Sequence, residues 1–298
     1  MIVTRHNPIL GTLVEIALET DDRRLARDVD DDVVAEFDRW ERILSIHDPH
    51  SEISRWKRRE VDGCSPDLRR VLLEAIDWAE RSDGAYTLSS GVVADLHRRT
   101  GLSGRVPTSE EYEWARHEME QPILRIDDGE PVRLGNVTGL DLNAFAKGWI
   151  VDRAVERATA RADIGITINA GGDLRRVSTD PLIVDLENPR RPYDNEPPVA
   201  RISLTSGGLA TTGLGRRSVL VGDELVSHIV DPRTGRPSRR HGSVTIVGPD
   251  AATADVLATI CYLDDTAIAL RRATDLGCGC VIVDLDGHIS HNDLVVLT

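Results

Sequence analysis

The second half of the chain is divided into apolar runs of four or five residues, separated by turn residues and by two helical segments. Short runs rich in Val, Ile and Leu are typical of strands. Asp127-Asp128-Gly129 and Asp286-Gly287 are hairpin turn signals between them. Together with helices at about 145–160 and 252–273, the runs predict an α+β fold with a mixed sheet and helices packed on it. The predicted strands are Ile123–Ile126, Ile164–Ile168, Leu182–Leu186, Ala200–Leu204, Ser218–Val221, Val244–Val247, Val281–Leu285 and Leu294–Leu297.

The first half predicts one strand and two helices. Thr12–Leu18 is apolar with partial alternation, which favours a strand. Asp67–Arg81 carries apolar residues three or four positions apart, which predicts a helix. Residues 82–122 predict loops with short helices, and Asn188–Pro198 predicts a surface loop. An earlier helical stripe consists of Leu25, Val29, Val33, Phe37, Trp40 and Leu44.

Composition excludes several classes of protein. A net charge of −14 argues against nucleic-acid binding, because a phosphate backbone requires a surface rich in Lys and Arg. No run reaches the roughly 18 apolar residues of a membrane span, and the four cysteines have no zinc-site spacing. The N-terminal residues lack the pattern of a signal peptide or lipoprotein anchor, so we expect a cytoplasmic protein. Aromatic residues make up only 4% of the chain, so its core must be aliphatic.

The first candidate cluster is Gly139–Asp152, a turn or strand end that leads into a helix from about Phe145. Asn143 is a candidate N-cap. Lys147, one of only two lysines in the chain, stands in the first helical turn. A helix N-terminus with unpaired amides favours phosphate, but a capped surface helix explains this segment equally well.

The second cluster is Ile168–Leu174, with the sequence Ile-Asn-Ala-Gly-Gly-Asp-Leu. Two adjacent glycines at a strand end let a ligand approach the backbone closely, and Asn169 and Asp173 are candidates to orient that ligand. A tight loop or bulge is the simpler explanation of the glycines. The segment matches neither the GxGxxG nor the P-loop pattern, so no site of those kinds is predicted.

The third cluster joins His228 to the turn Asp231–Gly235, which has Pro at a position that turns favour. An unperturbed imidazole titrates near neutrality, so a histidine beside such a turn is a candidate acid or base. A histidine with satisfied hydrogen bonds within a strand is the competing interpretation, and it is favoured when the segment is considered alone.

The fourth cluster is the predicted helix within Pro249–Leu263, which consists mainly of small and apolar residues. Asp255 and Thr259 are four residues apart and therefore share one helical face. A buried carboxylate needs a partner, and carboxylate and hydroxyl oxygens suit Mg²⁺. A helix with a single polar seam is the alternative.

In this order, the four clusters resemble the ApbE family, the FAD:protein FMN transferases, over nearly the whole chain. The motifs D-L-x-x-x-x-K-G, N-A-G-G-D, H-I-x-D-P-x-T-G and A-D-x-x-x-T are the most specific marks of the family. Leu10-Gly11-Thr12, Ser51-Glu52-Ile53 and Asp83–Tyr86 add weaker similarity.

The resemblance implies a T-fold-related architecture, a single domain over residues 1–298 with two lobes around a flavin-nucleotide cleft. It implies that FAD binds with its pyrophosphate on Mg²⁺. A Thr or Ser hydroxyl of an acceptor flavoprotein attacks the phosphorus on the FMN side, and AMP leaves. Water replaces that hydroxyl in some members. An FAD pyrophosphatase is therefore an alternative, and a non-catalytic FAD or nucleotide carrier is another.

The resemblance also implies roles for individual residues. Asp255 and Thr259 match the metal-binding side chains, Ala144 offers only its backbone carbonyl, and Ala258 stands where some members have a second Asp. His228 is the expected base or proton relay, and Asp255 is counted with it as catalytic. The implied cofactor contacts are Leu10, His47, Ala85, Tyr86, Thr87, Asp141, Lys147, Asn169, Gly171, Gly172, Asp173 and Val230.

Three of these cofactor contacts differ from the family pattern. Leu10 replaces a Met, His47 stands where a Tyr contacts the cofactor, and Thr87 replaces an Asp. All three lie on the flavin or adenine side of the implied site. They motivate the carrier hypothesis, in which FAD binds without turnover.

Overall fold

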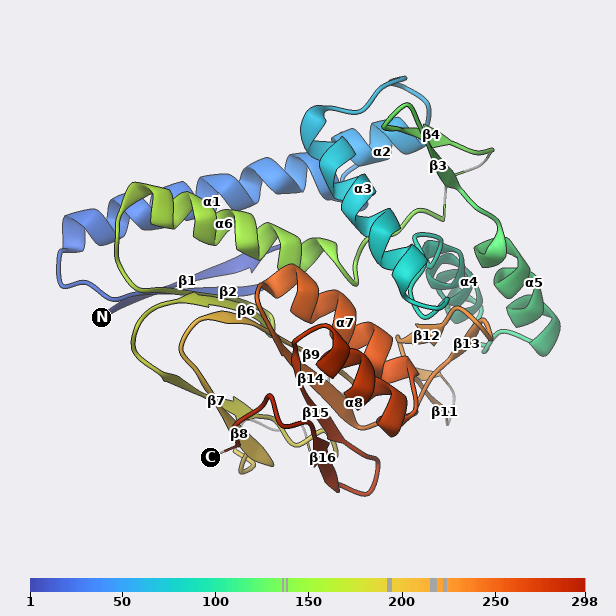
Figure 1. Ribbon diagram of the computed structural model, residues 1–298. Helices are drawn as coiled ribbons and strands as arrows, with labels where there is room; N and C mark the ends of the chain where they lie inside the picture. Colours follow the sequence, from blue (N-terminus) through green and yellow to red (C-terminus); the bar gives the residue numbers. More distant parts are fainter. Residues whose placement is uncertain (136, 138, 192–194, 215–218, 222–223, 298) are drawn as a thin grey trace. The chain divides into compact units, whose positions relative to one another are not determined.

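The computed structural model describes residues 1–135, 137, 139–191, 195–214, 219–221 and 224–297, with the backbone alone for 219–221 and 224–226 (Figure 1). The chain divides into two compact units. The first unit comprises Met1–Glu41, Ala144–Gly213 and His241–Thr298, and the second comprises Arg42–Asn143 and Leu214–Arg240. Each unit is therefore assembled from segments that are far apart in the chain.

A sheet of eight strands forms the centre of the first unit, in the order β1-β2-β5-β6-β9-β14-β15-β16. All of its pairings between described residues are antiparallel, whereas the sequence predicted a mixed sheet. Short turns join β1 to β2, β5 to β6 and β15 to β16, and turns this short connect only antiparallel neighbours. The strands are β1 (Ile2–Ile9), β2 (Thr12–Leu18), β5 (Ile166–Ala170), β6 (Asp173–Val177), β9 (Gly207–Gly213), β14 (Ser243–Gly248), β15 (Gly279–Val283) and β16 (Ile289–His291).

Helices α1 (Arg23–Leu44), α6 (Ala146–Arg161), α7 (Ala251–Leu263) and α8 (Thr266–Asp275) pack on one face of this sheet (Figure 1). The predicted apolar stripe of α1 faces the core, and only Leu25 of that stripe is not fully buried. The ring of Trp40 on α1 meets Trp149 on α6 edge to face, with the ring centroids 4.4 Å apart. This contact fixes α1 against α6.

The opposite face of the sheet is covered by a hairpin of β7 (Leu182–Leu186) and β8 (Ala200–Leu204). Neighbouring residues of β6 show the two faces, because Leu174 packs toward the hairpin while Arg175 reaches Asp152 on α6. The apolar cluster between hairpin and sheet consists of Leu174, Leu186, Ile202, Leu204, Leu209, Val281 and Val295. The sheet is therefore buried on both sides near its centre.

The second unit contains helices whose ends follow ordinary capping rules. The Ser51, Ser65 and Thr108 hydroxyls accept a backbone N–H three residues further on, which satisfies one of the free amides at each helix start. Asp128 and Gly129 both have positive φ in the predicted hairpin turn. The elements are α2 (Glu52–Lys57), α3 (Pro66–Arg81), α4 (Gly91–Leu102), α5 (Ser109–Glu120), and the hairpins β3 (Leu124–Asp127) with β4 (Glu130–Arg133), β10 (Val219–Val221) with β11 (Glu224–Val226), and β12 (Val230–Asp231) with β13 (Arg236–Pro237).

Several sequence predictions need correction. Residues 82–122 contain two helices of 12 residues each, α4 and α5, in place of short helices. The helix predicted at 252–273 is two helices, α7 and α8, because Asp264 and Asp265 between them have extended backbone. The predicted strand Leu294–Leu297 makes only one isolated bridge, from Leu297 to Ile202.

Two further predictions fall partly on residues 192–194 and 218, which lie outside the described residues. The rest of the predicted strand Ser218–Val221 forms β10. The described part of Asn188–Pro198 contains no helix or strand, in agreement with the predicted loop. Within the described ranges, every helix is too short or too polar to cross a membrane.

Candidate functional site

The start of α6 lies directly against α7. The helix begins at Ala146, with Phe145 at the N-cap position and no side-chain cap, so the prediction of Asn143 as the N-cap is wrong. The Gly148 N–H, one of the first-turn amides of α6, instead donates to Asp255 Oδ2 at 3.1 Å. The physical reason is that a carboxylate from a second helix replaces the local cap.

Asp255 and Thr259 lie on one face of α7, as predicted, but they contact different neighbours. The Asp255 side chain is buried, and 7% of the residue is exposed. Thr259 is half-buried, and its hydroxyl lies 3.1 Å from that of Thr212 on β9. The face of α7 that carries Asp255 and Thr259 therefore packs against polar groups of α6 and β9, and not against a purely apolar surface.

A second buried carboxylate holds the beginning of α7. Asp152 on α6 accepts the N–H groups of Ala251 and Ala252 at 2.9 Å each. Arg175 Nε lies 3.6 Å from Asp152 Oδ1. Burial raises the pKa of Asp152 to about 6, and the two N–H groups and Arg175 counteract only part of this effect.

The Asn169–Asp173 segment is a tight two-residue hairpin turn between β5 and β6. Gly171 and Gly172 have φ of +63° and +104°, values that favour glycine. Gly172 N–H donates to Asn169 Oδ1 at 2.9 Å. A side-chain carbon added at Gly171 would overlap the Thr12 hydroxyl. The local alternative, a tight loop, therefore accounts for both glycines, which are exposed.

The side chain of Asp173 connects this turn to α6. Asp173 is 3% exposed and forms an ion pair with Lys147 in the first turn of α6. The Lys147 ammonium also lies 3.3 Å from the carbonyl oxygen of Ala170. The structure thus brings together two sequence clusters, the K-G helix start and the N-A-G-G-D loop.

Leu10 lies at the same end of the sheet as this turn. Leu10 occupies the turn between β1 and β2 with φ of +51°, and its N–H donates to Glu41 Oε1 at 2.9 Å. The pairing of Val14 with Ala170 aligns the two turns, and Gly171 N–H reaches the Leu13 carbonyl. Leu10 is half-buried, as is Ala144, which precedes α6 in the chain.

Asp141 belongs to the second unit, where it is buried beside a lysine. Asp141 Oδ1 accepts the Asn143 N–H at 2.8 Å, and Lys57 Nζ donates to the Leu140 carbonyl at 2.7 Å. Burial raises the pKa of Asp141, while the Asn143 N–H, Lys57 and His47 act in the opposite direction. Burial lowers the pKa of Lys57, and the charge of Asp141 opposes that shift. Each charge of this pair therefore stabilises the other.

The segment that contains Ala85, Tyr86 and Thr87 passes close to Asp141. Ala85 and Tyr86 are buried, while Thr87 is half-buried and its hydroxyl accepts the Ser89 N–H. The Asp141 N–H donates to the Leu88 carbonyl at 2.8 Å. His47 is exposed, in the loop between α1 and α2. The second unit thus contains four further predicted cofactor contacts, His47 and residues 85–87, besides the buried Asp141.

His228 is exposed and lies between β11 and β12, so its interpretation as a residue within a strand is wrong. Asp231 forms the predicted turn, since its carbonyl accepts the Gly235 N–H at 2.8 Å and its carboxylate pairs with Arg233 at 2.9 Å. Val230 is half-buried against the apolar residues of α4 and α5. Packing of Val230 therefore holds the turn in place while His228 remains accessible.

The sequence did not single out four residues that contact the candidate residues or the helices that carry them: Lys57 in the second unit, and Gly148, Asp152 and Thr212 in the first. The signal for Lys57 was the scarcity of lysine. A glycine in a first helical turn and an acid within an apolar helix segment were available signals for Gly148 and Asp152. Thr212 becomes recognisable only through the contact between β9 and α7.

The residues predicted to bind a metal have donors that suit Mg²⁺. A buried carboxylate, a half-buried hydroxyl and a backbone carbonyl are all hard oxygen donors. No sulfur or imidazole belongs to the predicted set, so softer ions are less well matched. Asp255, Thr259 and Ala144 therefore fit the ion that the sequence implied.

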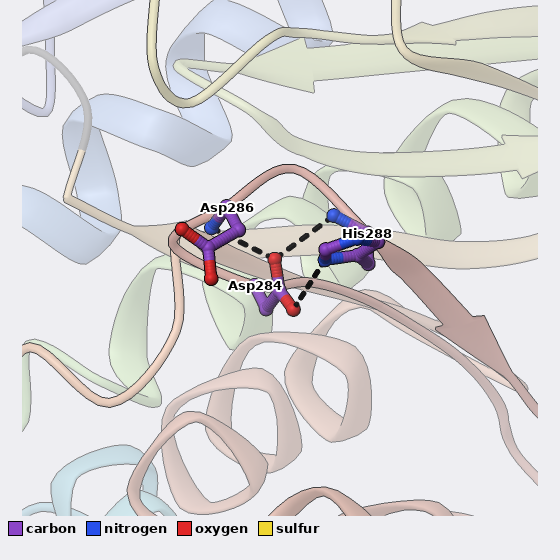
Figure 2. Close-up of side chains that lie close together, drawn as sticks. All are labelled: Asp284, Asp286 and His288. Carbon is purple, nitrogen blue, oxygen red and sulfur yellow. Dashed lines mark hydrogen bonds and ion pairs between the residues drawn. The ribbon is translucent and has the colours of Figure 1, made fainter.

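A different acidic group closes the turn between β15 and β16 (Figure 2). Among the described residues, Asp284, Asp286 and His288 are the only such trio of His, Cys, Asp or Glu with potential ligand atoms close together. Asp284 accepts the N–H groups of Asp286 and His288 at 2.8 Å each, and His288 Nδ1 lies 3.2 Å from Asp284 Oδ2. These hydrogen bonds account for the group as a hairpin turn, as Asp286-Gly287 predicted.

Comparisons with known proteins agree with this picture. The sequence profile of the ApbE family matches residues 10–282. An FAD:protein FMN transferase of Treponema pallidum is 27% identical over 288 residues, which cover 87% of this chain and 78% of that protein. An FAD:protein FMN transferase of Haemophilus influenzae is 24% identical over 264 residues, which cover 83% and 76%.

The fold is also that of a solved relative. The crystal structure of an ApbE protein from Thermotoga maritima superposes with a TM-score of 0.88 at 27% identity, over 98% of this chain and 97% of that chain. The predicted α+β fold with packed helices is thereby confirmed. Since the profile spans all four motif clusters and the fold agrees over nearly the full length, the chain belongs to the ApbE family.

Proposed function

We propose that this chain is an FAD:protein FMN transferase, which moves the FMN moiety of FAD onto a Thr or Ser hydroxyl of an acceptor protein with Mg²⁺ and releases AMP. The observation that carries the proposal is the placement of Asp255. Its buried carboxylate lies at the start of α6, one helical turn from Thr259, in a chain of the ApbE family. The relatives that bear this activity in their names support the flavin chemistry.

Asp255, Thr259 and the Ala144 carbonyl are the residues that would hold Mg²⁺. When bound, the ion would polarise the phosphoryl oxygens and neutralise charge that develops on them. Lys147 contributes a further positive charge, and its ion pair with Asp173 and contact with the Ala170 carbonyl hold that charge at one place. We assign to Lys147 the orientation of the pyrophosphate.

The family resemblance implies that His228 is the acid–base group. We assign His228, which is exposed, to remove the proton from the attacking hydroxyl. The hydroxyl oxygen forms a bond to the FMN-side phosphorus, and the bond from that phosphorus to the bridging oxygen breaks. The bridging oxygen leaves with AMP, and the proton remains on the imidazole until solvent accepts it. Asp141 and the 85–87 segment are assigned to binding FAD.

The test is to incubate the protein with FAD, Mg²⁺ and an acceptor peptide, and to follow AMP by chromatography and the peptide by mass spectrometry. We expect stoichiometric AMP and a peptide that gains the mass of the FMN moiety. FMN and AMP without any acceptor would identify an FAD pyrophosphatase instead. Stoichiometric FAD binding with no AMP would identify a carrier and contradict the proposal.

A variant of His228 tests the assigned base. We expect His228→Ala to lower kcat by about 10²- to 10³-fold while KM for FAD stays within a factor of about three, because general-base catalysis acts on the rate. His291→Ala, which removes another exposed histidine, is the matched control and should leave both constants unchanged. A change in KM alone would exclude His228 from proton transfer.

A further inference from the structure

Helices α6 and α7 each carry an Asp whose carboxylate accepts backbone N–H groups from the N-terminus of the other helix. Asp152, in the second turn of α6, accepts the first two amides of α7, those of Ala251 and Ala252. Asp255, in the second turn of α7, accepts the Gly148 amide in the first turn of α6. Each helix thus supplies the acceptor that the start of the other helix lacks.

The amides at the start of α7 are satisfied in two different ways. Asp250, at the N-cap, accepts the Thr253 N–H through its carboxylate at 2.7 Å and the Ala254 N–H through its carbonyl at 3.2 Å. These two bonds stay within α7. Of these four amide bonds, those of Ala251 and Ala252 connect α7 to another helix, and both go to Asp152. Asp152 and Asp250 therefore have separable functions at one helix end.

Gly148 permits the close approach of α6 and α7 that these reciprocal hydrogen bonds require. A side-chain carbon at Gly148 would overlap the Ala251 carbonyl and would lie 2.9 Å from Asp255 Cβ. Gly148 and Asp152 are four residues apart on α6, so they present one face to α7. The backbone of α6 can therefore rest directly on the first turn of α7.

We propose that Asp152 is a positioning residue for the metal site, which sets the position of Asp255 by fixing the start of α7 on α6. This inference rests on the proposed function, because it assigns to Asp255 the role of a metal ligand. Groups that hold a ligating side chain in place affect metal affinity about 10- to 100-fold when they are removed. Asp152 acts through α7 and does not itself contact the metal ligands.

The test measures metal binding in the absence of FAD. Mn²⁺, which accepts the same oxygen donors as Mg²⁺, is titrated into the full chain, and the free ion is followed by electron paramagnetic resonance. We expect Asp152→Asn to raise the Kd for Mn²⁺ at least about 10-fold. Asparagine can accept only one of the two N–H groups and turns its own NH₂ toward the other.

Asp250→Ala is the matched control. It also removes a carboxylate that accepts an N–H from the first turn of α7, but the lost bond lies within α7 and not between the helices. We expect a lower Tm in both variants and a weaker Mn²⁺ affinity only in Asp152→Asn. Equal Mn²⁺ affinities in Asp152→Asn, Asp250→Ala and the wild type would show that Asp152 is merely structural, and would overturn the proposal.

If Asp152→Asn does not fold, hydrogen exchange on the wild-type chain decides the question. Mn²⁺ should slow exchange of the Ala251 and Ala252 amides, since an ion held by Asp255 immobilises the start of α7 through Asp152. Unchanged exchange would overturn the proposal. FMN transfer is measured in parallel, so transfer with unaffected Mn²⁺ binding in Asp152→Asn refutes only the positioning role. If the wild type transfers no FMN but Asp152→Asn still binds Mn²⁺ more weakly than the wild type, only the proposed function is refuted.

Discussion

The two units hold their candidate residues in different ways. In the first unit, Asp255, Thr259 and Lys147 stand on helices, and each contacts a neighbouring element through a side chain. In the second unit, His47, the 85–87 segment and His228 lie in loops, bends or turns between elements. Phosphoryl chemistry requires fixed positions for charged groups, whereas recognition of a cofactor tolerates variation in loops.

The departures from the implied family pattern all lie outside helices and strands. Leu10, His47 and Thr87 stand in connecting segments, Leu10 in the first unit and the other two in the second. The motif residues on α6 and α7 retain the family identities at Lys147, Asp255 and Thr259. The comparison predicts that substitutions on the helices of the first unit act on the rate or on stability, and that substitutions at His47 and in the 85–87 segment act mainly on affinity for FAD.

The largest effect is expected for Asp255. Asp255→Ala should lower Mg²⁺-dependent AMP release by about 10³-fold or more, because the ion would lose its only anionic ligand in the predicted set. The same change leaves the Gly148 N–H without its acceptor, which costs about 1–3 kcal/mol of unfolding free energy. AMP release and urea unfolding measure the two effects.

Asp255→Asn separates these two consequences. Asparagine keeps an oxygen that can accept the Gly148 N–H but removes the charge. We expect activity as low as that of Asp255→Ala together with stability within about 1 kcal/mol of the wild type. Full activity in Asp255→Asn would mean that the ion is held elsewhere and would break the distinction between the two units.

The two lysines provide the next comparison. Lys147→Met leaves Asp173, which is 3% exposed, as a buried and unpaired carboxylate, and should destabilise the chain by about 3–5 kcal/mol. Lys57→Met removes a charge that burial already opposes, together with its bond to the Leu140 carbonyl. Asp141 loses a favourable charge but keeps the Asn143 N–H, so the loss should be smaller, about 1–2 kcal/mol. Urea midpoints at one pH measure the difference.

A second substitution checks the cause of the larger loss. Adding Asp173→Asn to Lys147→Met should recover most of the lost stability, because the stranded charge is removed. If the double variant is as unstable as Lys147→Met alone, the loss does not come from Asp173. Equal losses in the two single lysine variants would also show that the two units hold their lysines alike.

A smaller effect is expected from the titration of Asp152. Its pKa is raised from 3.8 in the unfolded chain to about 6 in the folded chain. The folded chain therefore holds a proton that the unfolded chain has released between about pH 4 and 6, and the contribution of Asp152 to stability falls as pH rises through this range. The decrease amounts to at most about 3 kcal/mol.

The measurement compares the unfolding free energies of the wild type and Asp152→Asn from pH 4 to 7. Because Asn does not titrate, the unfolding free energy of the wild type minus that of Asp152→Asn should fall between about pH 4 and 6 and stay constant above about pH 6. The charge of Asp250 raises the pKa of Asp152, so Asp250→Asn should lower that pKa and narrow the pH range over which the unfolding free energy falls. A difference that grows with pH would contradict the assigned direction.

The sequence predicted the elements of the fold better than the contacts between them. Thr12–Leu18 and the hairpin turn at Asp127–Gly129 were predicted because their patterns depend on neighbours in the chain. The N-cap of α6 was predicted at Asn143 because a cap is normally local, whereas Asp255, 107 residues from Gly148, provides the acceptor. The break at Asp264 and Asp265 was missed because apolar spacing continues across it.

The candidate site shows the same limit. The pairing of Lys147 with Asp173 joins two motifs that the sequence had identified separately, and nothing in either motif specifies the contact. The sequence signals for Asp152 and Lys57 did not specify a role, because the importance of both residues comes from burial beside other groups. Sequence patterns therefore identified the residue types that carry chemistry, while the residues that hold them required the tertiary structure.

The smallest effect is expected at His47, on the loop side of the comparison. The family resemblance places a cofactor-contacting Tyr at this position, and a tyrosine ring adds apolar and stacking contact worth about 0.5–1.5 kcal/mol. His47→Tyr should therefore tighten FAD binding about 2- to 10-fold, as measured by quenching of flavin fluorescence, with kcat unchanged. His50→Tyr, an exposed position in the same loop, should leave the affinity as it is. Equal effects of both substitutions would show that the added ring acts nonspecifically, and a weaker affinity in His47→Tyr would mean that this loop contacts FAD through the imidazole itself.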